Sequence, residues 1–166
     1  MLNIEKYINE IIPPADYQHR NGFSNTQSID KLDEQEKKLV EDALIRKLSI
    51  HAPDDLIIDT LTYLRSTNAL PLLYQALQVS SSPMMKIILA SSIFELNGDA
   101  DVVDVCMVAL TELEGNKAYY KYTLPTAFYY LAKTNSDKLN SLIGRYVDHR
   151  EYLISYNAKR HFKGKS

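Results

Sequence analysis

The sequence predicts an all-α protein, built as a right-handed solenoid of helical hairpins with flanking capping helices. The main observation is a pattern that occurs three times: the end of a helix, a short polar break and the start of a new helix. The leucines that close these helices, Leu64, Leu96 and Leu131, lie 32 and 35 residues apart. A period of this size, with two helices in each unit, is typical of helical repeat proteins.

Composition and charge narrow the class of protein. The 166 residues fit one domain, 1–166, and the proportions of 45% hydrophobic and 24% charged residues are ordinary for a globular protein. A net charge of −2 argues against a dedicated nucleic-acid binder. The N-terminus lacks the pattern of a signal peptide, and the longest apolar stretch, 84–94, is too short to cross a bilayer. A cytoplasmic protein is therefore expected.

The first fifty residues, 1–50, are expected to form N-terminal helices around a mobile loop. Apolar residues recur at helical spacing over residues 2–12. The segment 13–30 is polar and without periodicity, which predicts a mobile loop. Asp33, followed three residues later by Glu36, matches a capping box and predicts that a helix starts there and runs to residue 50.

The central region, 53–147, is expected to contain three pairs of helices. Pro53 suits the first turn of the first helix. Ser82 and Pro83 read as the N-cap and first residue of a strongly apolar helix, and Gly98 suits the residue after its end. The three predicted pairs span residues 53–79, 83–114 and 117–147.

The sequence also predicts a bend in the last helix pair and a separate helix at the C-terminus. Pro125 lies inside the helix predicted over 117–133 and should bend it. Residues 150–166 are expected to form a C-terminal helix and a basic tail whose end is frayed.

The period, the Asn- and Asp-containing breaks and the proline in a first helix resemble the HEAT-like (armadillo-type) repeat superfamily. The resemblance covers residues 53–147 and depends on pattern rather than on invariant residues. It implies antiparallel helix pairs stacked in one direction, with the second helix of each pair lining a concave surface. The helices of 1–50 would then cap the stack.

No motif for catalysis is present in the sequence. Phosphate-binding glycine loops, the nucleophile elbow and the paired-histidine zinc motif are all missing. Cys106, the only cysteine, lies on an apolar helix face and is expected to be a buried structural thiol. The histidines lack the spacing of metal ligands: they are His19, His51, His149 and His161. The sequence therefore predicts no catalytic residue, metal or cofactor.

Charge is segregated in the middle pair. Residues 87–116 contain six acidic residues and neither lysine nor arginine. In a HEAT-like stack this region would form an acidic inner patch that binds a basic partner. The alternative is a solvated helix face whose acidic residues near the N-terminus complement the helix dipole. The residues expected to bind a partner here are Asp99, Asp101, Asp104, Thr111 and Glu112.

The second feature that indicates a binding surface is a cluster of tyrosines. The chain has twelve tyrosines and no tryptophan, and five of the tyrosines fall within residues 119–130. Tyr119, Tyr122 and Tyr129 share one helical stripe, and tyrosine suits interfaces because it offers a large contact area and a hydroxyl group. The alternative is that these rings simply pack between neighbouring helices. The opposite side, expected to face the core, carries Leu124, Phe128 and Leu131.

These features favour a non-enzymatic protein-binding module. By analogy, an acidic helical protein of this size looks like an immunity or antitoxin-type inhibitor of a basic toxin or nuclease. Two alternatives stay open: a HEAT-like nucleic-acid enzyme of the alkylpurine DNA glycosylase type, and a general scaffold. A glycosylase needs a basic track for phosphates, whereas the clearest basic cluster here is the terminal segment 159–165.

Overall fold

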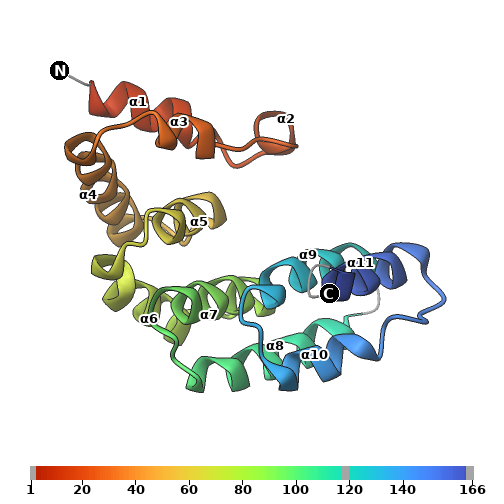
Figure 1. The fold of residues 1–166 in the computed structure, drawn as a ribbon. Helices are drawn as coiled ribbons and strands as arrows, with labels where there is room; N and C mark the ends of the chain where they lie inside the picture. The colour runs from red at the N-terminus through yellow and green to blue at the C-terminus, as the bar shows by residue number, and fades with distance from the viewer. Residues whose placement is uncertain (1–2, 117–119, 164–166) are drawn as a thin grey trace. The chain divides into compact units, whose positions relative to one another are not determined.

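The computed structural model describes residues 3–116 and 120–163, and within them all regular structure is helical (Figure 1). The all-α prediction is confirmed for this part of the chain. The chain divides into two compact units, residues 1–75 and 76–166, and each is described by itself. The prediction of one domain over 1–166 stays a prediction. Tyr119 and residues 164–166 lie outside the described residues.

The first unit is built around a long central helix. Helix α4 packs against both α1 and α5. Its core contains aliphatic side chains from all three helices, among them Ile8, Val40, Leu44, Ile58 and Leu61. In chain order the elements are α1 (Ile4–Ile11), α2 (Tyr17–Arg20), α3 (Thr26–Asp30), α4 (Glu34–Ile50), α5 (Asp55–Tyr63), the 3₁₀ helix η1 (Thr67–Ala69) and α6 (Leu70–Val79), within which the division between the units falls.

Helix starts in this unit follow local capping chemistry. The predicted capping box is present, because Asp33 Oδ1 accepts from the Glu36 backbone N–H at 2.8 Å and Glu36 Oε2 accepts from the Asp33 N–H at 3.2 Å. The expectation that Pro53 lies in the first turn of α5 is wrong. Asp54 is the N-cap, since its carboxylate accepts from the backbone of Leu56, so Pro53 precedes the helix.

The segment 13–30, for which the lack of periodicity predicts a mobile loop, is partly helical. It contains α2 and α3, and a buried amide ties it to two other helices. Asn25 Nδ2 donates to the Ile11 carbonyl at 3.0 Å and to Thr60 Oγ1 at 2.8 Å. Because Thr60 lies 35 residues away in sequence, no local pattern could have indicated this bond.

In the described part of the second unit, the helices α7 to α11 contact one another in a regular order. Helix α7 packs against α8 and α9, α8 also packs against α9 and α10, and α9 also packs against α10 and α11. In Figure 1, α8 and α10 lie side by side, as do α9 and α11. The bounds are α7 (Pro83–Asn97), α8 (Asp101–Gly115), α9 (Tyr120–Ala132), α10 (Asp137–Gly144) and α11 (Tyr152–Lys163).

Each of the three predicted breaks contains a residue in the left-handed region. These residues are Arg65 with φ 56°, Gly98 with φ 72° and Asn135 with φ 46°. A left-handed residue just after a helix ends the i→i−4 hydrogen-bond pattern and turns the chain. The predicted cap at Ser82 is also confirmed, since its hydroxyl accepts from a backbone N–H of the first turn of α7. Pro125 lies inside α9, as expected.

Candidate protein-binding surfaces

The acidic residues predicted on α8 are exposed on one side of the helix. The α8 acidic face consists of Asp101, Asp104, Thr111 and Glu112, and all four side chains are exposed. Val108, which is 59% exposed, lies among them by helical spacing. The opposite side of α8 is buried through Val102, Val103, Cys106, Ala109, Leu110 and Leu113. The apolar residues of α8 therefore determine which side its acidic residues present.

Two lysines from other helices pair with this face. Lys138 of α10 lies 3.3 Å from Asp104 Oδ1, and Lys86 of α7 lies 3.5 Å from Glu112 Oε2. Both lysines lie outside the span 87–116 whose lack of basic residues had suggested an uncompensated patch. Exposed pairs of this kind contribute little to stability, so a binding partner can replace them. No cation in the described part of the chain forms an ion pair with Asp101.

Asp99, the remaining acidic residue predicted to bind a partner, does not belong to the α8 acidic face. It lies in the break before α8, is half-buried, and accepts from the Asp101 backbone N–H at 3.0 Å. Its carboxylate therefore helps to start the helix rather than facing solvent from α8.

The tyrosines predicted on α9 project from the side opposite its core residues. Tyr122 and Tyr129 are each 61% exposed. Lys121 Nζ lies 5.1 Å from the ring centroid of Tyr122, and Lys133 Nζ lies 5.0 Å from that of Tyr129. A cation at these distances is attracted by the face of the ring. The residues predicted to face the core, Leu124, Phe128 and Leu131, are buried.

Tyr129 borders a groove between α9 and α11, here named the α9–α11 groove. Its volume is about 390 Å³. Its apolar lining comes from α9, and its cations are Lys133 of α9 and Arg160 of α11. None of the described residues that line it carries a carboxylate. The lining residues are Pro125, Phe128, Tyr129, Ala132, Lys133, Asn157, Arg160 and His161.

Helix α11 extends this surface with residues that were not predicted. The rings of Tyr152 and Tyr156 stack with centroids 5.6 Å apart, and the Arg160 guanidinium lies 5.9 Å from the Tyr156 ring. The three residues are four apart, which places them on one helix face. That spacing was visible in the sequence and could have identified them.

In its described lining, the α9–α11 groove contains only the aromatic part of the predicted partner-binding residues. The α9–α11 groove contains Tyr129 but, among its described lining residues, no member of the α8 acidic face. In this groove Tyr129 has the basic neighbours Lys133 and Arg160, and the acidic, tyrosine-rich surface stays a prediction.

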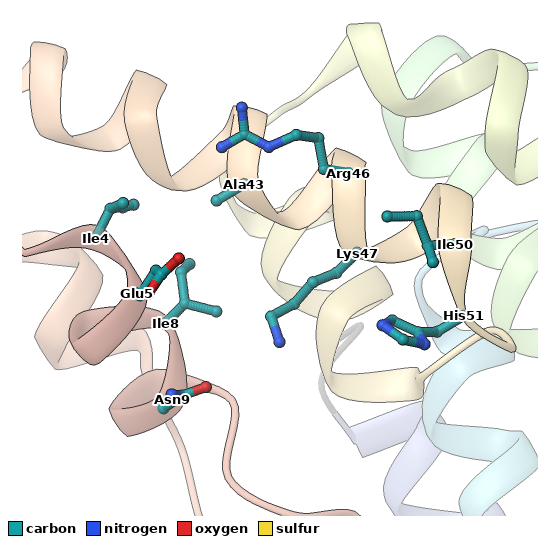
Figure 2. A pocket seen from close by; sticks show the side chains of 9 residues that line it. All are labelled: Ile4, Glu5, Ile8, Asn9, Ala43, Arg46, Lys47, Ile50 and His51. Carbon is teal, nitrogen blue, oxygen red and sulfur yellow. The ribbon is translucent and has the colours of Figure 1, made fainter.

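A second groove lies in the first unit, between α1 and α4 (Figure 2). We name it the α1–α4 groove, and its volume is about 370 Å³. Cations line it from the C-terminal part of α4, and polar side chains line it from α1. No motif in the sequence had pointed to it. The lining residues are Ile4, Glu5, Ile8, Asn9, Ala43, Arg46, Lys47, Ile50 and His51.

The titratable residues of the described ranges form no metal-binding cluster, and Cys106 is buried. Burial raises the pKa of the Cys106 thiol to about 11, against a small opposing effect of Ser91, and the side chain is fully buried, as expected. Across residues 3–116 and 120–163, no three His, Cys, Asp or Glu side chains are placed to hold a metal ion. Within the same ranges, no helix combines the length and the apolar character required to cross a membrane.

Comparison with known proteins gives no family assignment. No protein-family profile, curated protein or solved structure matches the chain.

Proposed function

We propose that the protein is a non-enzymatic protein-binding module that contacts its partner through the α9–α11 groove. One observation carries the proposal: exposed Tyr129 and the cations Lys133 and Arg160 surround an apolar groove of about 390 Å³. Tyrosine and arginine are the residues most often found at binding hot spots. Lys133 also lies over the ring of Tyr130, so its charge is held at this edge of the groove.

The groove favours a partner segment that combines an apolar side chain with carboxylates. Its described lining carries two cations and no acidic group, so it is complementary to negative charge. The apolar floor, which includes Pro125 and Phe128, suits an aliphatic or aromatic side chain.

The proposal includes a HEAT-like, right-handed arrangement of helix pairs. Two features support it: α7, α9 and α11 contact one another in sequence, and α8 contacts α10. The left-handed residues at the three breaks also suit a repeated helix–turn–helix unit. In this arrangement α9 and α11 are the first helices of successive repeats, so the groove lies on the face opposite the concave surface that the second helices line.

A second candidate function is that of an immunity or antitoxin-type inhibitor of a basic toxin or nuclease in the cytoplasm. The exposure of the whole α8 acidic face favours it, together with the absence of an ion pair to Asp101 among the described residues. The two candidates differ in the charge of the partner and in the helix that it contacts.

The test is a titration of the full-length chain with a partner captured from the native cell extract. Tyr129→Ala and Arg160→Glu are each expected to weaken binding about tenfold, because both residues line the proposed contact and are of types enriched at binding hot spots. Tyr17→Ala is the matched control: Tyr17 is 78% exposed but belongs to the first unit, so its loss should leave affinity unchanged.

Three results would contradict the proposal or replace it. Equal affinity of Tyr129→Ala and wild type would refute the groove as the contact surface. A basic partner whose binding depends on Asp101 instead of Arg160 would favour the inhibitor. Binding of DNA at physiological salt that depends on Arg160 would favour a nucleic-acid function, since cations and tyrosines also hold phosphates and bases.

A further inference from the structure

The α1–α4 groove combines apolar walls with two cations from α4, Arg46 and Lys47, and one carboxylate from α1, Glu5, so its positive charge is in excess. Ile8 of α1 is buried and Ala43 of α4 is half-buried, whereas Ile50 is 74% exposed. Figure 2 shows the Lys47 side chain extending from α4 into the space beside Ile8 and Asn9. A volume of about 370 Å³ falls in the range common for ligand sites.

The cations of the groove are available for a ligand. Elsewhere on α4, Lys37 pairs with Glu34 at 2.9 Å and Lys38 pairs with Glu41 at 3.1 Å. By contrast, no described carboxylate forms an ion pair with Arg46 or Lys47. Helix α4 therefore neutralises its cations near the N-terminus and leaves two uncompensated at the groove.

We propose that the α1–α4 groove binds an acidic peptide segment that carries an aliphatic side chain. The aliphatic side chain would contact Ile8 and Ala43, and the flanking carboxylates would pair with Arg46 and Lys47. The side-chain amide of Asn9 offers a donor and an acceptor to the peptide backbone. The exposure of Ile50 leaves the groove open along its length, which suits a peptide better than an enclosed acyl chain.

The inference is independent of the proposed function. It concerns residues of the first unit only, and either site can fail without the other.

The experiment uses the full-length chain and a fluorescein-labelled nine-residue peptide with one leucine flanked by glutamates. Fluorescence anisotropy at low salt should show saturable binding, and a peptide with lysine in place of glutamate should not bind. Lys47→Glu is expected to weaken binding about fivefold. Lys31→Glu is the matched control, because it makes the same change of charge at an exposed lysine of the same unit outside the groove.

A second measurement does not require a variant. In ¹⁵N–¹H correlation spectra of the wild-type chain, the acidic peptide should shift the backbone amides of Ile8, Ala43 and Lys47. Lack of saturable binding, or an equal effect of Lys31→Glu and Lys47→Glu, would overturn the proposal. Binding of dodecanoate with the same amide shifts, when the peptide produces none, would assign the groove to a lipid instead.

Discussion

The guanidinium of Arg20 makes a two-point contact with the carboxylate of Asp54, which lies 34 residues further along the chain. Nη1 donates to Oδ1 and Nη2 donates to Oδ2, each at 2.8 Å. The same guanidinium donates to the Pro13 carbonyl through Nε at 3.0 Å and through Nη2 at 2.8 Å. Arg20 therefore joins the start of the 13–30 segment to the N-cap of α5.

Removal of Arg20 should destabilise the first unit. The Arg20 side chain is 16% exposed, and Arg20→Ala leaves the partly buried carboxylate of Asp54 without its cation. We expect the free energy of unfolding to fall by about 1.5–3 kcal/mol, the usual cost for hydrogen bonds to charged groups. Arg20→Lys should retain only part of the lost free energy of unfolding, because an ammonium cannot reproduce the two-point geometry.

Urea denaturation of the full-length chain measures this effect. The matched control is Lys37→Ala, which removes a solvent-accessible pair with Glu34 and should cost far less than Arg20→Ala. Similar losses in the two variants would show that Arg20 acts as an ordinary surface charge.

Stability should fall in acid through Asp54. Partial burial raises the pKa of its carboxyl, but hydrogen bonds from Arg20 and from the backbone of α5 outweigh burial, so the folded pKa lies below 3.8. A depressed pKa means that the stabilisation is complete above pH 3.8 and is lost as the pH falls through the folded value.

Asp54→Asn tests this linkage, because asparagine keeps the N-cap and removes the charge. The free energy of unfolding, followed from about pH 6 to about pH 2.5, should decline less steeply in Asp54→Asn than in wild type. Parallel curves would exclude Asp54 as a source of the acid sensitivity.

Two glycines should respond with opposite signs to replacement by alanine. Gly98 has φ 72°, whereas Gly115 ends α8 in a helical turn, and apart from its chain neighbours a β-carbon added at either position would meet none of the described residues within 4 Å. Gly98→Ala should therefore cost about 1 kcal/mol from backbone conformation alone. Gly115→Ala should gain up to about 0.5 kcal/mol from helix propensity. Thermal unfolding followed by circular dichroism compares the two variants, and a stabilised Gly98→Ala would contradict the left-handed assignment.

The Cys106 thiol should be almost unreactive in the folded protein. A pKa of about 11 against an ordinary 9.0 lowers the thiolate fraction at pH 8 about 100-fold, and full burial blocks the reagent as well. The reaction with dithiobis(nitrobenzoic acid) should therefore be at least about 100-fold slower in buffer than in denaturing urea. A fast reaction in buffer would place Cys106 near the surface.

Sequence reasoning succeeded where the deciding atoms are neighbours in the chain. The capping box joins Asp33 to Glu36, the cap of α7 joins Ser82 to the next turn, and Gly98 needs only its own φ. The exposure of Tyr122 and Tyr129 followed from helical spacing in the same way. The prediction that Pro53 lies in the first turn of α5 was wrong because the adjacent Asp54 is the N-cap, so the helix begins after it.

The features that the sequence did not predict depend on contacts between segments that are distant in the chain. Arg20 with Asp54, Asn25 with Thr60 and Lys138 with Asp104 are separated by 34 or 35 residues. No residue in the polar segment 13–30 indicates which distant group will bind it, so the sequence alone predicts a loop there. The charge balance of α8 likewise depends on lysines from α7 and α10.

The amino-acid sequence by itself determined that the chain is helical and where most of its helices begin and end, because capping and periodicity act over a few residues. Only the tertiary structure decided which charges are compensated and which side chains share a groove. The reason is that ion pairs and grooves require atoms from separate helices to lie within a few ångströms of each other.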